Sequence, residues 1–327
     1  MTRSREHHLI RSAAINRGDT IGIIAPAGPV NREKLEAGID RLRELGFNPI
    51  HLSNIFDRDL YFAGGVQRRA SELHEMFRRT EVKGIICARG GYGSNYLLPH
   101  LDLELIGKNP KIICGYSDLS TLLTYLHDTL NLVSLHGPMV SKDFSEQDGI
   151  HVDSFLAATG GQASWTISNS DSPTLQPIVH GTAEGKLYGG CLSLLVASLG
   201  TPYEIQTDET ILFLEDLGEW PYRIDRMLMH LKYAGKLDRV RGIIFGEMID
   251  CATSPSSGYT IQEVIARMVG YLKIPVAFGL RSGHVSAGNI TLPIGVRARL
   301  TVNETVSLEI LEAATVSRAE TLKAGRD

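Results

Sequence analysis

The first half of this 327-residue chain alternates short apolar runs with amphipathic helical patterns, and no other feature limits its fold as strongly. Strands are expected over residues 20–25, 48–52, 84–88 and 111–115, and helices over 32–45, 70–79 and 119–130. In the first helix, one face carries Leu35, Ile39, Leu42 and Leu45, and Gly46 follows as a typical helix end. Short strands separated by helices are typical of βαβ units with parallel strands. We therefore predict a doubly wound α/β first half.

Residues 153–180 depart from this pattern and are rich in Gly, Ser and Pro, which indicates a connection between two domains. Beyond it we expect a helix ending near residue 199, strands over 210–214, 242–245 and 276–280, and a helix over 222–234. The last strands, 298–302 and 306–310, predict an antiparallel hairpin. The predicted organisation is an N-terminal α/β domain over 1–152, a linker over 153–180 and a smaller mixed α/β domain over 181–327. The first 17 residues are expected to form a frayed extension.

Composition excludes several classes of protein. The chain is 43% hydrophobic and 21% charged, as in soluble globular proteins. Its formal net charge of -4 offers no basic surface for a polyanion, so nucleic acid is not a predicted partner. No apolar run approaches the roughly 18 residues that cross a bilayer, and the N-terminus has no signal-peptide pattern. The cysteines, none in a C-x-x-C pair, are predicted to be buried thiols of a cytoplasmic protein: Cys87, Cys114, Cys191 and Cys251.

A serine follows the strand over 111–115, in the segment Gly115-Tyr116-Ser117-Asp118. Its hydroxyl is expected to point away from the sheet, next to helix N-terminal amides that can receive an oxyanion. The competing interpretation is that Ser117 or Asp118 caps the helix, and this segment by itself favours the cap. The hydrolase pattern G-x-S-x-G is not matched, because residue 119 is Leu.

A serine nucleophile needs a base and a carboxylate that orients the base. His284 follows the strand over 276–280 in a glycine-containing loop and is the favoured base, with His136 as its rival. Glu215 ends an apolar strand, where an acid is costly unless it is paired. Asp216 and Glu219 stay open as alternatives to Glu215.

The glycine-rich loop Gly90 to Gly93 allows close approach of its backbone to a ligand. Arg89 beside it is a candidate for binding a substrate carboxylate, and a structural salt bridge is an equally good interpretation. G-x-G-x-x-G, Walker and H-E-x-x-H patterns are not matched, and no His/Cys cluster has metal-ligand spacing, so no metal or cofactor is predicted. A non-catalytic protein that binds a ligand at this loop is an alternative to an enzyme.

Taken together, these segments resemble the L,D-carboxypeptidase family of serine peptidases, which also includes the self-immunity proteins against microcin C. The resemblance runs from Asp19 to near Arg299. Its motifs, in chain order, are Ala88-Arg89-Gly90-Gly91-Tyr92-Gly93, Gly115-Tyr116-Ser117-Asp118, Leu135-His136-Gly137-Pro138-Met139, Gly189-Gly190-Cys191-Leu192-Ser193, Leu214-Glu215-Asp216, and Gly283-His284 with Asn289 and Leu292-Pro293-Ile294-Gly295.

The resemblance implies a triad of Ser117, Glu215 and His284, which reverses the preference for a helix cap. It also implies an oxyanion hole formed by the amides of Asp118 and Gly91, while Tyr116 shapes the pocket. The implied fold is a flavodoxin-like doubly wound domain bearing Ser117 and a mixed α/β domain bearing Glu215 and His284. Cys191 stands where relatives often have Asn, which leaves the chemistry unchanged and is expected to alter the substrate pocket.

The substrate that the resemblance implies is a murein tetrapeptide, from which terminal D-alanine is released in cytoplasmic peptidoglycan recycling. Arg89 and Arg226 are the candidates for binding its terminal carboxylate. The alternative is an immunity-type hydrolase that cleaves a peptidyl or aminoacyl nucleotide. That substrate calls for an aromatic side chain to stack on the base, and Trp165 and Trp220 are the tryptophans of the chain. A homodimer is expected from the general frequency of twofold assemblies.

Overall fold

The structure is a computed structural model that describes residues 9–251 and 258–317. Within these residues, the first of two sheets has the strand order β12-β5-β4-β3-β1-β2. Its parallel strands pair in the flavodoxin-like order β2-β1-β3-β4-β5. They are β1 (Thr20–Ile24), β2 (Asn48–His51), β3 (Val82–Cys87), β4 (Ile112–Gly115) and β5 (Ser134–His136).

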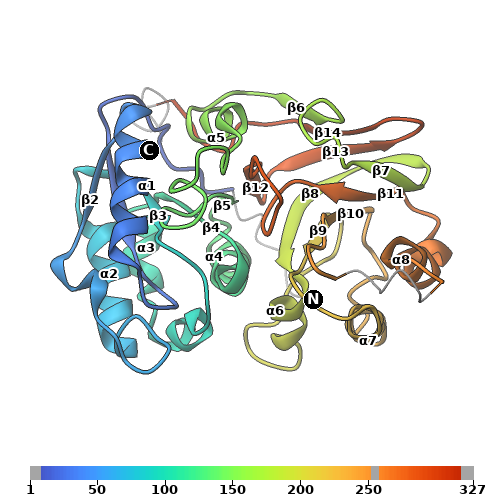
Figure 1. Cartoon of the computed structure of the whole chain (residues 1–327), viewed down its shortest axis with the longest axis horizontal. Coiled ribbons are helices and arrows are strands. Elements are labelled where there is room, and N and C mark those ends of the chain that lie inside the picture. Colours follow the sequence, from blue (N-terminus) through green and yellow to red (C-terminus); the bar gives the residue numbers. More distant parts are fainter. Residues whose placement is uncertain (1–8, 252–257, 318–327) are drawn as a thin grey trace, which may run out of the picture.

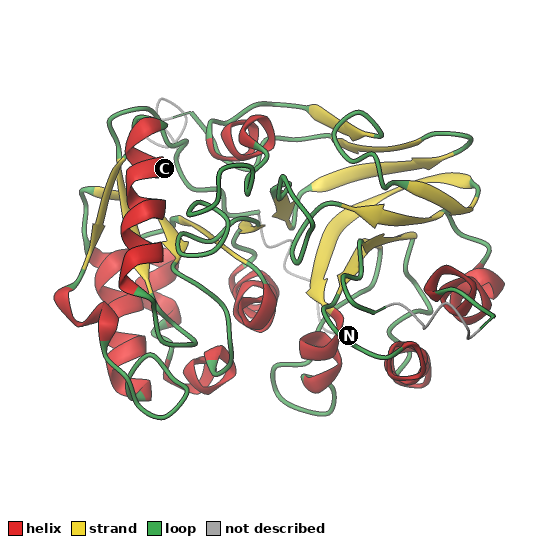
Figure 2. Ribbon diagram, in the orientation of Figure 1, coloured by secondary structure: helices red, strands yellow, loops and turns green. Residues whose placement is uncertain are grey.

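Helices surround this sheet, as Figures 1 and 2 show. The α-helices are α1 (Arg32–Glu44), α2 (Val66–Arg78), α3 (Leu103–Lys108), α4 (Ser120–Leu130) and α5 (Val152–Thr159), with 3-10 turns η1 (Ser53–Phe56), η2 (Ser94–His100) and η3 (Ser117–Leu119). Helix α1 buries Leu35, Ile39 and Leu42 of the predicted face, while Leu45 is the half-buried C-cap residue. Asn31 caps the first turn. The apolar spacing therefore decides which face of the helix covers the sheet.

The second sheet has the order β6-β14-β13-β8-β9-β10-β11-β7 in the described residues. Its four central strands are parallel, and antiparallel strands extend both edges. The strands are β6 (Trp165–Ser168), β7 (Gln176–Val179), β8 (Gly181–Cys191), β9 (Thr210–Glu215), β10 (Gly242–Gly246), β11 (Val276–Leu280), β13 (Arg297–Val302) and β14 (Val306–Ile310). Beside it lie α6 (Leu192–Ala197), α7 (Pro221–Tyr233), α8 (Ile261–Val269) and η5 (Gly270–Leu272).

The predicted fold class is confirmed: a doubly wound first half is followed by a mixed α/β second half. The predicted terminal hairpin is formed by β13 and β14. Regular structure also occurs in the predicted linker, which contains most of α5 together with β6 and β7. β6 and β7 have four residues each, and half of β7 is exposed, so they give too short an apolar alternation to be recognised from sequence.

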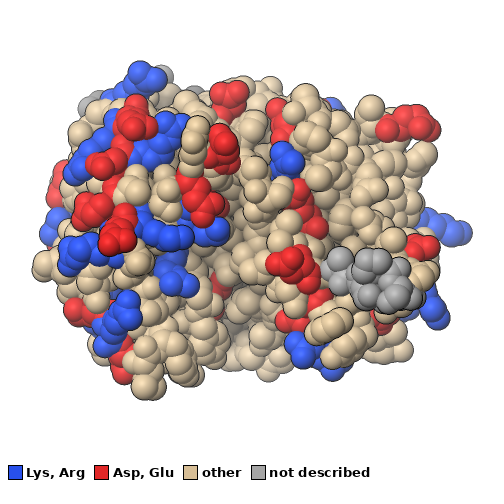
Figure 3. Space-filling model, viewed as in Figure 1, with Lys and Arg blue, Asp and Glu red and all other residues tan. Residues whose placement is uncertain are grey.

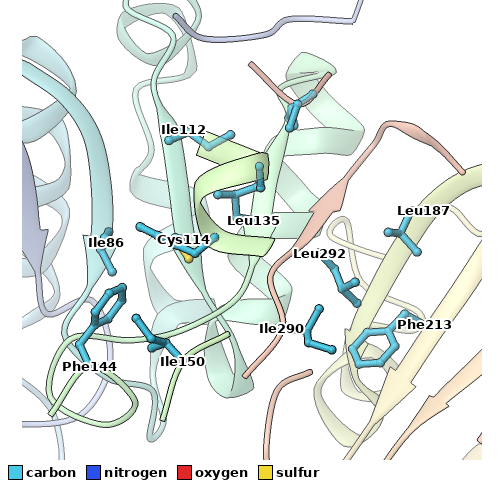
Figure 4. Close-up of a cluster of buried hydrophobic side chains, with 14 of the residues drawn as sticks. Ile86, Ile112, Cys114, Leu135, Phe144, Ile150, Leu187, Phe213, Ile290 and Leu292 are labelled. Carbon is cyan, nitrogen blue, oxygen red and sulfur yellow. The ribbon is translucent and has the colours of Figure 1, made fainter. Parts of the chain in front are cut away.

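One strand of the first sheet comes from the second half of the chain. β12 (Leu292–Ile294) pairs antiparallel with β5, and its Leu292 and Ile294 are fully buried. Figure 4 shows the apolar cluster that results, which runs from Ile86 and Leu135 past Leu292 to Phe213 of the second sheet. The two sheets therefore share a continuous core, and the predicted domain boundaries remain a prediction.

The expectation of a frayed N-terminal extension is wrong for residues 9–17. Ile10 forms a bridge with Leu132 and Ala13 forms one with Val316, while Ser12, Ala14 and Ile15 are buried. Arg11 also pairs with Glu312. Apolar side chains spaced along this segment pack it onto the body of the protein, and residues 1–8 lie outside the described residues.

Three surface and composition features bear on the predictions. The four cysteines are buried free thiols, as predicted. In the described part of the chain, no helix is both long and apolar enough to span a bilayer. Acidic and basic side chains are interspersed on the face shown in Figure 3, without a large field of one sign.

Candidate active site

Loops from the carboxyl ends of β1 and β3 meet where the strand order of the first sheet reverses, the usual position of ligand sites in such sheets. The amide of Gly28 donates to the carbonyl of Gly90 at 3.1 Å. Gly91 has a φ of +115°, and a Cβ on it would lie 3.1 Å from the Cα of Gly28. Glycine is therefore required for this close approach of two backbones.

Ser117 lies at the end of β4 with a φ of +63°, an unfavourable backbone conformation for a residue with a side chain. The preceding loop leaves room for it, because a Cβ added to Gly90 would be 2.9 Å from the Cβ of Ser117. Neither η3 nor α4 has a side-chain cap. The Asp118 carboxylate instead accepts a hydrogen bond from the amide of Ser94 at 2.7 Å. The helix-cap interpretation of this segment is thus wrong.

Glu215 and His284 are joined by two hydrogen bonds. The Oε2 atom of Glu215 accepts from Nδ1 of His284 at 2.7 Å and from its main-chain amide at 3.1 Å. Glu215 is fully buried at the end of β9. A Cβ on Gly283 would lie 2.6 Å from the Cδ of Glu215, so a glycine before His284 makes room for the carboxylate. The donor role of Nδ1 leaves Nε2 of His284 as the acceptor of the ring.

Each member of this pair shifts the pKa of the other. Burial by itself would raise the pKa of Glu215, but the charge and hydrogen bonds of His284 lower it overall. Burial by itself would lower the pKa of His284, but the charge and hydrogen bond of Glu215 raise it overall. Glu215 is therefore held as a carboxylate that orients the imidazole and stabilises its protonated form.

The rival residues have other environments. His136 is fully buried between Tyr116 and Phe213, and burial lowers its pKa to about 4. The Asp216 carboxylate accepts hydrogen bonds from the amides of Ser193 and Leu217 at 2.8 and 2.9 Å. Glu219 forms a solvent-accessible ion pair with Arg223 at 3.3 Å. Of the candidate carboxylates, Glu215 is the one hydrogen-bonded to a candidate base.

Ser117 and His284 line one pocket of about 410 Å³. Arg89, Tyr116 and Gly91 line it too, whereas Arg226 lies exposed on α7 and is not among the lining residues. Cys191 is buried with its sulfur 3.7 Å from Asp216, also outside the lining, so it does not alter the pocket by direct contact. The full lining is Asn31, Lys34, Arg89, Gly90, Gly91, Tyr116, Ser117, Met139, Ser141, Lys142, Leu217 and His284.

Sequence reasoning missed two further cations of the pocket, Lys34 and Lys142. Lys34 lies in the first turn of α1, and Lys142 pairs with Glu146 at 3.1 Å. Arg89 is exposed and donates to the carbonyl of Pro29 at 3.1 Å, and no carboxylate of the described residues forms a salt bridge with it. Neither lysine belongs to a sequence motif. They line the same pocket as Arg89 only because α1 and the loop after β5 fold next to each other there. The pocket combines a serine, an oriented histidine and several positive charges.

No group of three or more His, Cys, Asp or Glu residues suited to a metal ion occurs in the ranges that the structure describes.

Family models match both halves of the chain. The LD-carboxypeptidase N-terminal domain matches residues 21–137, and the LD-carboxypeptidase C-terminal domain matches residues 184–300. These ranges contain Ser117 in the first case and Glu215 and His284 in the second.

Curated relatives match over nearly the full length. The chain is 39% identical over 294 residues to the probable murein peptide carboxypeptidase of Bacillus subtilis (strain 168), covering 89% of this chain and 91% of that one. It is 30% identical over 325 residues to the microcin C7 self-immunity protein MccF of Escherichia coli, covering 89% and 93%.

Solved structures give the same result. A MccF-like protein from Bacillus anthracis str. Ames has a TM-score of 0.85 at 30% identity, covering 93% of this chain and 99% of that one. The muramoyltetrapeptide carboxypeptidase from Oxalobacter formigenes has a TM-score of 0.79 at 30% identity, covering 90% and 99%. The agreement of sequence and fold over almost all of the chain shows that it belongs to the LD-carboxypeptidase family of serine peptidases.

Proposed function

We propose that the protein releases terminal D-alanine from murein tetrapeptides in cytoplasmic peptidoglycan recycling, through an acyl-enzyme formed on Ser117. The observation that carries the proposal is the hydrogen-bonded pair of Glu215 and His284 at a pocket that Ser117 also lines. A nucleophile, a base and an orienting acid are the parts that acyl transfer requires.

In the proposed mechanism, Nε2 of His284 takes the proton of Ser117 as its oxygen attacks the scissile carbonyl. His284 then gives that proton to the leaving amine of D-alanine. Water hydrolyses the acyl-enzyme in a second cycle of the same groups. Glu215 stays ionised and holds the ring through Nδ1.

The amides of Asp118 and Gly91 are proposed to hold the oxyanion. Asp118 belongs to the first turn after Ser117, where helical N–H groups have no acceptor within the helix. Gly91 lines the pocket in the loop that packs against Ser117. Donors placed where negative charge develops stabilise the transition state more than the substrate.

The positive charges of the pocket support a substrate with a free carboxylate beside the scissile bond. Arg89, Lys34 and Lys142 all line it. We assign the terminal carboxylate to this group and withdraw Arg226, which lies outside the pocket. The homodimer remains a prediction.

A peptide fits the pocket better than a nucleotide. Tyr116 is the aromatic side chain among the described lining residues, and it is 1% exposed, so its face is not free to stack on a base. Trp165 packs in β6 against the core, and the exposed Trp220 is not among the lining residues. The immunity-type activity on a peptidyl nucleotide is therefore the second choice.

The test is incubation of the purified chain with murein tetrapeptide, followed by mass spectrometry for tripeptide and D-alanine. Ser117→Ala is expected to lower kcat by several orders of magnitude with the fold preserved. Ser71→Ala, on the exposed face of α2, is the matched control and keeps full activity. Turnover by Ser117→Ala at the wild-type rate contradicts the proposal. Hydrolysis of a peptidyl adenylate without D-alanine release replaces it with the second choice.

A further inference from the structure

A buried carboxylate outside the proposed triad connects the first half of the chain to the loop that bears His284. Asp143 follows β5 and is 4% exposed. Its Oδ1 accepts from the hydroxyl of Tyr116 at 3.3 Å and from Nδ2 of Asn289 at 3.2 Å. Its Oδ2 accepts from the amide of Met139 at 2.8 Å. Three donors from separate segments thus converge on one side chain.

Asn289 links Asp143 to Gly283, the residue before His284. Its Oδ1 accepts from the amide of Gly283 at 3.0 Å, and its Nδ2 donates to the carbonyl of Gly283 at 3.2 Å. Asn289 is fully buried, so these bonds form without competition from water. The orientation of the Asn289 amide is fixed by the donor and acceptor that Gly283 presents.

Asp143 also fixes one wall of the space around the imidazole. The ring of Tyr116, held at its hydroxyl by Asp143, packs edge-on against His284 with centroids 5.1 Å apart and an interplanar angle of 83°. Glu215 holds the Nδ1 side of His284. The ring is constrained both by Tyr116, which Asp143 anchors, and by Glu215.

We propose that Asp143 is a positioning residue for His284, acting through Asn289 and Gly283 on its backbone and through Tyr116 on its ring. This inference rests on the proposed role of His284 as the base. It explains why a carboxylate occupies the position: three donors face two oxygens, and an amide would turn an N–H₂ group toward at least one donor. Asp143→Asn therefore loses either the bond from the amide of Met139 or the bond from Asn289, depending on the side that its N–H₂ group faces.

A swap of the two side chains tests the geometry. Asp143→Asn and Asn289→Asp should each lower kcat about tenfold to 100-fold with KM unchanged, because a small displacement of the base affects the chemical step. In the double variant, the amide introduced at position 143 donates to the carboxylate introduced at position 289, whose second oxygen accepts from Gly283. The double variant should recover much of the lost kcat. Recovery is partial, because the carbonyl of Gly283 loses its donor.

The pH profile supplies a readout that a purely structural role would not move. The acidic groups that raise the pKa of His284 are Glu215, Asp216 and Asp143. Burial raises the pKa of Asp143 to about 6, so its charge is fully present only above that pH. Loss of this charge lowers the pKa of His284, so Asp143→Asn should shift the acidic limb of kcat/KM to lower pH. The double variant keeps one carboxylate in the network and should shift the limb less.

The matched control is Asp148→Asn, because Asp148 lies in the same loop and its side chain is exposed. Its main-chain carbonyl accepts a hydrogen bond from the amide of Gly288, and the substitution leaves this bond in place. It should keep wild-type kcat. If Asp143→Asn does not fold, Asn289→Ala takes its place. It removes the two hydrogen bonds to the main chain of Gly283 and leaves Asp143 bonded to Tyr116 and Met139. Wild-type kcat in a folded single variant overturns the inference, as does a double variant no better than the product of the singles. Activity of Ser117→Ala, by contrast, overturns the proposed function itself.

Discussion

At the scale of single residues, the candidate site depends on side chains that have unusual backbones or unusual burial. Ser117 has a left-handed backbone, which costs about 1–3 kcal/mol for a residue with a side chain and is typical of functional positions. Glu215 is a fully buried acid, stabilised by its bonds to His284. In both cases the surrounding fold holds the residue in a backbone conformation or an environment that is unfavourable for that residue by itself.

Glu215→Gln is expected to lower kcat by about 10²–10⁴-fold, because an amide does not fix the imidazole tautomer as the carboxylate does. The pH dependence should change in a defined direction. In the wild type the pKa of His284 is raised above the ordinary value of 6.5, so its neutral base form becomes the major form only at a higher pH than for an ordinary histidine. Removal of the Glu215 charge lowers this pKa, and the acidic limb of kcat/KM should move to lower pH.

The measurement is kcat/KM for D-alanine release between about pH 4 and pH 9, a range that spans the ordinary histidine value. Glu219→Gln is the matched control, since Glu219 pairs with Arg223 and not with His284. An acidic limb of Glu215→Gln that coincides with the wild-type limb would rule out the assigned role of Glu215.

At the scale of elements, the pair β8 and β9 carries Glu215 to its position. The strands run parallel, with Gly189 opposite Phe213 and Cys191 opposite Glu215. Gly189 has a φ of +130°, and a Cβ on it would lie 2.0 Å from the carbonyl oxygen of Phe213. The glycine pair that the sequence marks as a motif is thus a condition for pairing the strand that holds the acid.

Gly189→Ala should destabilise the protein by more than about 2 kcal/mol, because backbone strain and a backbone clash add. It should also lower kcat, since β9 shifts with Glu215. Gly200→Ala is the control, because Gly200 also has a positive φ, of +75°, but nothing lies within 4 Å of an added Cβ. Urea unfolding compares the two, and equal losses of stability would contradict the steric explanation.

At the scale of the whole molecule, the halves are interlocked. β12 completes the first sheet from the second half, and the bridge between Ala13 and Val316 ties the beginning of the described chain to its end. Burial of Leu292 and Ile294 contributes about 2 kcal/mol each, a large part of a net stability of about 5–15 kcal/mol. The first half therefore depends on the second for its own sheet.

We expect separately produced fragments 1–152 and 153–327 to be inactive, and fragment 1–152 to lack a cooperative thermal transition, because the β5 edge and the apolar cluster around it are uncovered. Mixing the two should restore D-alanine release. Mixing with the Ser117→Ala fragment should not. Circular dichroism and the release assay measure both outcomes, and a cooperative transition of fragment 1–152 on its own would show that β12 is dispensable.

Much of the fold follows from local patterns. The strands of the first half, α1 and the β13–β14 hairpin lie close to where apolar spacing predicts them. The patterns do not reveal β6, β7 and β12, because strands of three or four residues are too short to show a period, even where every side chain is buried as in β12. The packed segment over residues 9–17 was missed because it is held by isolated bridges to Leu132 and Val316, far away in the sequence, and not by regular secondary structure.

The sequence by itself determined the chemistry that is available: a serine at a strand end, a histidine in a glycine loop and an acid that closes an apolar strand. Only the tertiary structure showed that Glu215, and not Asp216 or Glu219, is hydrogen-bonded to His284, that Arg226 lies outside the pocket, and that Lys34 and Lys142 line it while Asp143 bonds to Asn289. The physical reason is the separation along the chain of the groups that interact. Secondary structure depends on spacing along a few residues, whereas hydrogen bonds such as Asn289 to Asp143 join groups 146 positions apart, and no local pattern records them.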